Sequence, residues 1–131
     1  MTTSTEQLAS ITESFEYVSE DLNQHIIERY HELCPDAAGL MSHMDEHMCG
    51  RMLEEVFLLV LGSEDFESWI DFELTNHESY GVRLEMYTHL FQALLDVIRG
   101  HLQADWTPAW QSAWEARIEY LLSVINRRNA A

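Results

Sequence analysis

Residues 84–125 read LEMYTHLFQALLDVIRGHLQADWTPAWQSAWEARIEYLLSVI, and this stretch decides the fold class. Apolar residues recur in it at the three- and four-residue spacing of one α-helical face. Thr107 and Pro108 interrupt the pattern with a pair typical of a helix start, a capping hydroxyl followed by proline in the first turn. The stretch therefore predicts two long helices, one over about residues 84–102 and one from Thr107 to about Ile125.

The rest of the chain has the same helical spacing and lacks the alternating pattern of a β-strand. Three further helices are expected, over about residues 4–18, 19–33 and 44–61. Pro35 should begin a short turn or a one-turn helix that runs to Met41, and Gly62 is a plausible C-cap of the third helix. Residues 63–80 are expected to be helical only in part. We therefore expect an all-α fold of six or seven helices in a single domain, residues 1–131.

The composition supports a folded domain and excludes two classes of partner. The 131 residues are 47% hydrophobic, which is enough for one core. They include 23 acidic and 7 basic residues, for a net charge of -16, so nucleic acid and anionic membranes are poor partners. The longest apolar run is six residues, Val56 to Leu61, whereas a membrane span needs about 20. With only two cysteines and no visible secretory signal, we expect a cytoplasmic protein.

A series of short motifs gives the C-terminal half a family resemblance. His77 opens the sequence HESYGV, Tyr87 follows ten residues after it, and Trp106-Thr107-Pro108 opens the last helix. In this order the motifs resemble the C-terminal half of a bacterial single-domain globin, related to the globin domain of flavohaemoglobins. Residues 26–41 are similar to the globin B and C helices. The resemblance implies a shortened globin-like fold.

The resemblance also implies a cofactor, haem b, between the helix over 44–61 and the segment that ends at His77. His77 would be the proximal iron ligand, with Val82 and Tyr87 on the same side. A ligating histidine needs a neutral ring whose other N–H is held by an acceptor, and Tyr87 matches a family position beside the proximal histidine.

Helical phase suggests the residues on the opposite, distal side of the haem. The apolar face of the third helix is expected to comprise Met48, Cys49, Met52, Val56, Leu59 and Val60. Met48 and Met52 would then lie over the iron, and Cys49 would allow close helix packing. Arg51 matches a position where many globins have a basic residue for a haem propionate, and Arg83 is the second basic residue near the expected pocket. A methionine-rich stripe is equally consistent with core filling.

Two family positions carry different residues here. Met41 stands where globins have a haem-stacking phenylalanine, and Ile27 stands where a distal tyrosine is frequent. A distal pocket of Ile27, Met41, Met48 and Met52 has no strong hydrogen-bond donor, and bound oxygen gains from such a donor. We therefore expect either better binding of CO or NO than of O2, or a six-coordinate iron with Met48 or His47 as its second axial ligand.

The first functional hypothesis is a haem protein that binds or senses a diatomic gas, with a redox or signalling protein as a possible partner. It would have no turnover of its own, because NO dioxygenase activity would need an external reductase. The second is a haem-free globin-fold module that binds a partner protein or an apolar ligand. The third and weakest is a zinc enzyme, since His43 to His47 matches the His-x-x-Glu-His pattern of one peptidase class.

Overall fold

The computed structural model describes residues 5–15, 20–62, 67–71, 77 and 81–130, and within these ranges it contains helices and turns but no strand. The expected all-α class is therefore confirmed for this part of the chain. The elements are α1 (Thr5–Phe15), the 3₁₀ turn η1 (Glu20–Leu22), α2 (Asn23–Leu33), α3 (Pro35–Leu40), α4 (Glu46–Leu61), α6 (Leu84–Leu102), the 3₁₀ turn η2 (Gln103–Asp105) and α7 (Pro108–Ala130). Residues 67–71 are also helical.

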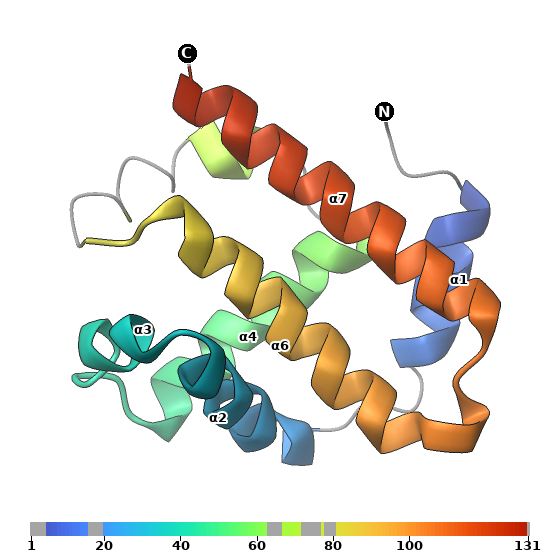
Figure 1. Cartoon of the computed structure of the whole chain (residues 1–131), viewed down its shortest axis with the longest axis horizontal. Coiled ribbons are helices and arrows are strands. Elements are labelled where there is room, and N and C mark those ends of the chain that lie inside the picture. The colour runs from blue at the N-terminus through green and yellow to red at the C-terminus, as the bar shows by residue number, and fades with distance from the viewer. Residues whose placement is uncertain (1–4, 16–19, 63–66, 72–76, 78–80, 131) are drawn as a thin grey trace.

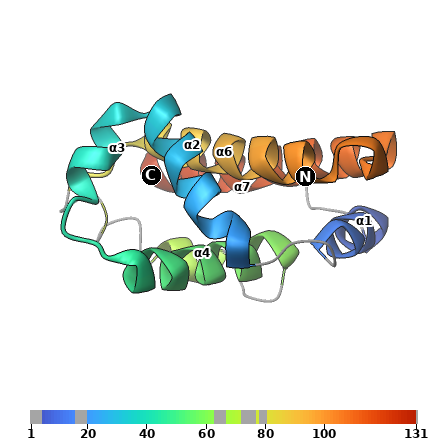
Figure 2. The same ribbon diagram turned by 90° about the horizontal axis from the view of Figure 1, so that it is seen from below.

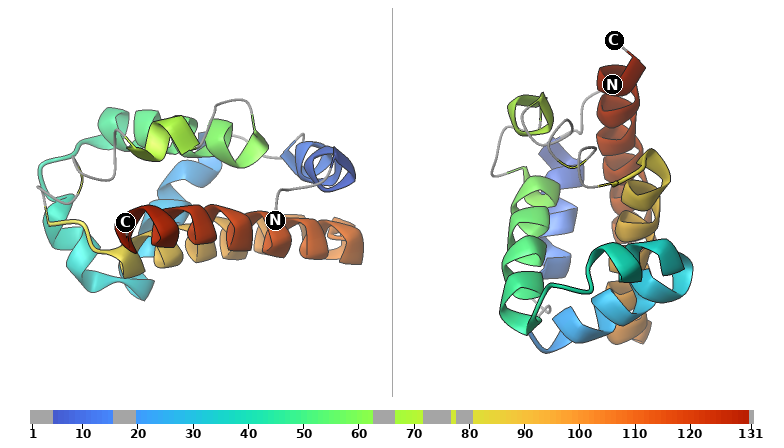
Figure 3. Two further views of the ribbon diagram at one scale, coloured as in Figure 1. Left: turned by 90° about the horizontal axis from the view of Figure 1, so that it is seen from above. Right: turned by 90° about the vertical axis from the view of Figure 1, so that its left-hand side faces the viewer.

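The helices form two layers (Figures 1–3). Helices α6 and α7 run antiparallel in one layer, and α1 and α4 lie in the other. Helix α2 crosses from the α4 layer to α6, so that it packs against both, and α3 follows it at one end of the molecule. Helix α1 packs mainly against α7, which brings the first and last helices together.

Local signals set the helix ends close to their expected positions. Helix α4 begins at Glu46 because the Asp45 carboxylate accepts a hydrogen bond from Met48 N at 2.8 Å. It ends at Gly62, whose φ of 79° is the left-handed C-cap conformation that glycine adopts without strain. Thr107 Oγ1 accepts from Trp110 N at 3.1 Å, which confirms the expected N-cap of α7.

Two expected boundaries differ from the structure. The expected second helix over 19–33 starts instead as η1, and regular α-helix begins only at Asn23. Helix α7 runs to Ala130, beyond the expected end at Ile125. Ion pairs explain the longer helix: Arg128 Nε lies 3.2 Å from Asp71 Oδ1, and both Arg127 and Arg128 lie 3.7 Å from a Glu67 oxygen. These pairs hold the last turns of α7 against residues 67–71.

The core lies between the two layers. Its fully buried side chains come from α1, α2, α4, α6, α7 and residues 67–71, and the largest are Trp114, Ile11, Ile26, Leu53, Leu59, Ile70, Met86, Leu94, Ile98, Leu121 and Ile125. Trp114 donates its indole N–H to Ser14 Oγ at 2.9 Å, so the two polar groups are satisfied inside the core. This bond ties α7 to α1.

Helix α2 crosses α4 at a glycine. A Cβ built on Gly50 would lie 3.8 Å from Asn23 Nδ2, an ordinary van der Waals distance, so Gly50 lies against the start of α2 although a larger residue would also fit there. The sequence predicts Cys49 as the small residue that allows close helix packing. The structure places the neighbouring Gly50 at the crossing, because one residue along a helix turns the side chain by about 100°.

Candidate functional site

His77 and Tyr87 meet near the start of α6. His77 Nδ1 lies 3.0 Å from Tyr87 Oη, and the two rings are 6.2 Å apart at 36°. Tyr87 is 8% exposed and fixed by α6, whereas His77 is half-buried. Val82 N donates to His77 O at 3.1 Å across a turn in which Gly81 has a φ of 91°. The turn and the side-chain contact together orient the imidazole.

The contact determines what the imidazole can do. When Nδ1 carries the ring proton, it donates to Tyr87 Oη, and Nε2 is then the ring nitrogen that has the lone pair. A tyrosine hydroxyl can accept that bond and also donate one of its own. The contact with Tyr87 therefore restrains the orientation of the His77 ring.

Trp69 connects His77 to α4. Its ring lies edge-on to the His77 ring, with centroids 6.0 Å apart at 65°, and its indole N–H donates to Glu55 Oε1 on α4. Trp69 is half-buried and packs against the core, next to fully buried Ile70. His77 is thus held on one side by α6 through Tyr87, and on another by α4 through Trp69.

The apolar residues expected at a haem pocket fall into two adjoining clusters. Ile27, Met52 and Val82 are partly buried and pack on the main core, to which Tyr87 also belongs. Met41 packs on a second cluster that Val82 shares, formed by Tyr30, Cys34, Ala37, Met86 and Ala93. Val82 packs on both clusters, as does Leu90, so the two clusters adjoin each other.

The buried face of α4 differs from the expected one in its first half. Met48 is 41% exposed and does not lie on the buried face as expected, whereas Leu53, which the expected face omitted, is fully buried. Val56, Leu59 and Val60 are buried as expected. Positions 53, 56 and 60 recur at helical spacing, and so do positions 48, 52 and 56. The periodicity alone therefore could not show which of the two sets faces the core.

Polar residues of the expected distal side are also exposed. His47 is exposed on the first turn of α4, whereas His43 is exposed in the turn before it, so the two histidines do not share a helix face. In the described residues, no group of three or more histidine, cysteine, aspartate or glutamate side chains is arranged to hold a metal ion. Cys49 is partly buried, and desolvation, followed by the charge of Asp45, raises the pKa of its thiol. A raised pKa makes Cys49 a poor nucleophile near neutral pH.

The two arginines expected near the pocket differ in their partners. Arg83 donates to Glu85 and to Asp36, at 2.8 and 2.7 Å, and these two hydrogen bonds raise its pKa. Arg51 is exposed on α4 and has no ion pair or hydrogen bond to any other described side chain. Arg51 is therefore the better placed of the two to receive an anionic group.

Arg117 is a buried cation that the sequence patterns missed. It is 6% exposed, and it donates from Nη2 to Leu59 O at 2.7 Å and from Nε to Val60 O at 2.9 Å. These carbonyls belong to the last turn of α4, where carbonyls lack regular intrahelical donors, and Leu59 O also accepts from Gly62 N at 3.2 Å. Burial lowers the pKa of Arg117, against the opposing effect of Tyr120, whose ring lies 5.4 Å from the guanidinium carbon. A lone arginine in an amphipathic pattern gives no sign of such a role.

Comparison with known proteins gives no family assignment: no protein-family model and no curated protein sequence matches this chain. Among the helices that the structure describes, none is long and apolar enough to cross a membrane.

Proposed function

We propose that this protein is a globin-like protein that binds haem b through His77 and so binds or senses a diatomic gas, O2, NO or CO. The contact between His77 Nδ1 and Tyr87 Oη carries the proposal. A histidine that ligates a metal almost always has its other ring nitrogen held by a partner, which fixes the tautomer and the ring orientation. His77 and Tyr87 are also the two residues that the globin resemblance pairs.

The helix arrangement supports the proposal. Globins pack their helices in crossing pairs around the haem pocket. Here α2 packs on both α4 and α6, α1 packs on α7, and the layers are bridged at one end by α2 and α3. His77 is linked to both layers, through Tyr87 on α6 and through Trp69 and Glu55 on α4.

The side chains around this region fit an apolar cofactor with an anionic edge. A bound haem b would supply the iron to which a diatomic gas binds. Ile27, Met41, Met52 and Val82, all partly buried, would contact its apolar surface. Arg51, whose charge is unpaired among the described residues, would meet a propionate.

The same residues support a preference among gases. Ile27, Met41 and Met52 offer no hydrogen-bond donor, so they would favour CO and NO over O2, which gains more from a donor. Met48 and His47 are both exposed, which favours a five-coordinate iron over one with either residue as a second axial ligand.

The test is a haem titration of the purified protein followed by its absorption spectrum. His77→Ala should weaken haem binding by at least about ten-fold, the scale on which ligand-shell changes act. His89→Ala is the matched control, because His89 is also half-buried and sits on α6. A Soret band in the wild type and in His89→Ala, lost in His77→Ala, supports the proposal. No band in the wild type, or equal bands in all three, rejects it.

A second candidate is a haem-free globin-fold module that binds a partner or an apolar ligand. It is favoured by the packing of Trp69, which covers one side of the His77 ring and is itself tied to Glu55. The same titration separates the two, because a haem-free module shows no Soret band at any haem concentration near that of the protein.

A further inference from the structure

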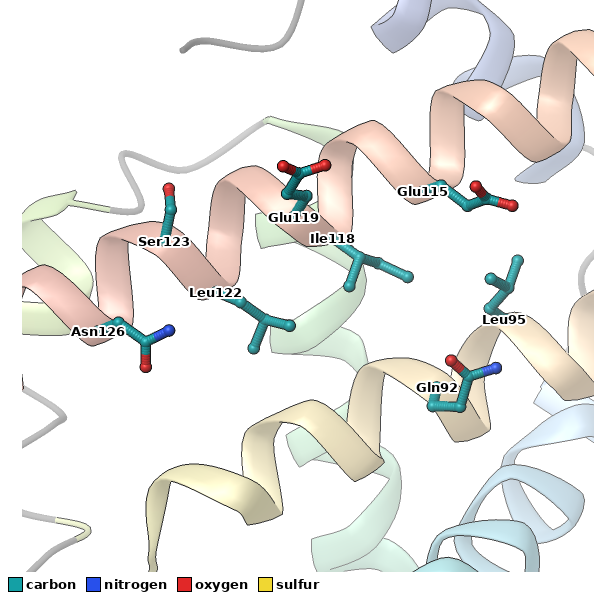
Figure 4. Close-up of a pocket in the computed structure, with 8 residues that line it drawn as sticks. All are labelled: Gln92, Leu95, Glu115, Ile118, Glu119, Leu122, Ser123 and Asn126. Atoms are coloured by element: carbon teal, nitrogen blue, oxygen red, sulfur yellow. The ribbon is translucent and has the colours of Figure 1, made fainter.

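A groove runs along the outer side of the α6–α7 pair, away from the proposed haem region. Its volume is about 420 Å³ (Figure 4). The lining residues are Gln92, Leu95, Glu115, Ile118, Glu119, Leu122, Ser123 and Asn126, and we call this surface the α6–α7 groove. In Figure 4 the ribbon of α4 lies behind the pair, so the labelled side chains are on the side opposite the α4 layer.

The groove combines an apolar base with an acidic edge. Leu95 is buried at its base, and Ile118 and Leu122 are half-buried, one turn apart on α7. Glu115 and Glu119 are exposed on the same helix, also one turn apart. Leucine and isoleucine side chains at this spacing are what an amphipathic helix packs against when it lies in a groove.

The acidic edge has no cation to neutralise it. Within the described ranges, neither Glu115 nor Glu119 pairs with an arginine, and the hydrogen bond to Glu115 comes from the neutral amide of Gln111. The nearest acid on α6 is different, because Asp96 is paired with both Arg29 and Arg99, at 3.0 and 3.2 Å. Arg29 and Arg99 are therefore already engaged, and within the described ranges no other arginine pairs with the two groove glutamates.

We propose that the α6–α7 groove docks a basic amphipathic helix of a partner protein. The apolar face of that helix would lie on Leu95, Ile118 and Leu122, and its Lys or Arg side chains would pair with Glu115 and Glu119. Charge complementarity selects this occupant. A second copy of the chain would bring the same two glutamates and a net charge of -16 to the interface, which opposes self-association. The proposal does not depend on haem.

The test uses a fluorescent peptide of about 18 residues, five helical turns, with Leu and Lys placed on opposite faces. Its anisotropy is measured against increasing protein, and a scrambled peptide of the same composition controls for the pattern. The groove variant is Glu115→Gln with Glu119→Gln. The matched control is Glu46→Gln with Glu54→Gln, which removes the same charge from the exposed face of α4.

The patterned peptide should bind more tightly than the scrambled one. The groove variant should weaken binding about five-fold, as expected for the loss of two exposed ion pairs, and the α4 variant should change it less than about two-fold. Leu122→Gln should also weaken binding, with the circular dichroism spectrum unchanged. Equal effects of the two charge variants, or equal binding of the two peptides, would overturn the proposal. So would a wild-type dimer that Leu122→Gln converts to monomer, because a second copy would then fill the groove.

Discussion

Replacing Arg117 by methionine should be one of the most destabilising single changes in this protein. The guanidinium is buried and donates two hydrogen bonds to the last carbonyls of α4, those of Leu59 and Val60. Methionine keeps the unbranched apolar stem that packs in the core but removes the guanidinium's hydrogen bonds to both carbonyls, of which Leu59 O keeps its bond from Gly62 N at 3.2 Å. The positive charge at the negative end of the α4 dipole is lost as well.

The expected loss follows from these contacts. Each hydrogen bond from a charged donor contributes about 1.5–3 kcal/mol, so the pair corresponds to about 3–6 kcal/mol. Removing the buried charge offsets part of this, because burial disfavours the charged guanidinium, as its lowered pKa indicates. We expect a net decrease of about 2–4 kcal/mol in the free energy of unfolding, and of about 10 °C in Tm.

Urea unfolding followed by circular dichroism measures this loss. The matched control is Arg127→Met, which removes an exposed arginine from the same helix and should cost less than about 1 kcal/mol. Arginine stays charged throughout the accessible pH range. The decrease in unfolding free energy for Arg117→Met should therefore be the same at about pH 6 and about pH 8. The reasoning is refuted if Arg117→Met unfolds like the control.

Three further predictions concern other parts of the structure. Tyr87→Phe removes the hydroxyl beside His77. Haem affinity in a Soret titration should fall about ten-fold, and the free energy of unfolding should fall by about 1 kcal/mol. No change in either quantity would contradict the assigned contact. Gly62→Ala should destabilise the protein by about 1 kcal/mol in thermal denaturation, because the φ of Gly62 is 79°. Gly100→Ala should instead stabilise it by about 0.5–1 kcal/mol, because nothing lies within 4 Å of the added Cβ. Burial raises the pKa of Tyr30 above its ordinary value of 10.0, so the folded state keeps a proton that the unfolded state loses above about pH 10. Wild-type stability should therefore fall more steeply than that of Tyr30→Phe above about pH 10, and parallel curves would refute this.

Where the chain carries local signals, the sequence predicted the structure well. The helix over 84–102, the cap at Thr107 and the end of α4 at Gly62 depend on spacing and on residues a few positions apart. The resemblance to globins directed attention to His77 and Tyr87, which the structure brings within 3.0 Å. A family resemblance can therefore predict a contact between two residues that are ten positions apart.

The parts that could not be predicted depend on which side of each helix meets a neighbour. Leu53 and Met48 both fit an apolar stripe, and the packing of α4 into the main core places Leu53 inside it and leaves Met48 41% exposed. Similarly, Arg117 acts on carbonyls 57 and 58 positions away. No pattern in the neighbourhood of Arg117 contains that information.

By itself, the sequence determined that the chain forms helices, where most of them end, and which charges are scarce, because these properties follow from local propensity and composition. The tertiary structure decided the rest. In the packed structure Arg83 pairs with Asp36 and Glu85. Among the described residues, Arg51 has no partner, and no arginine pairs with Glu115 or Glu119. A charge has a partner only when another helix brings one within reach, so the pairing of charges is a property of the packed helices and not of the sequence pattern.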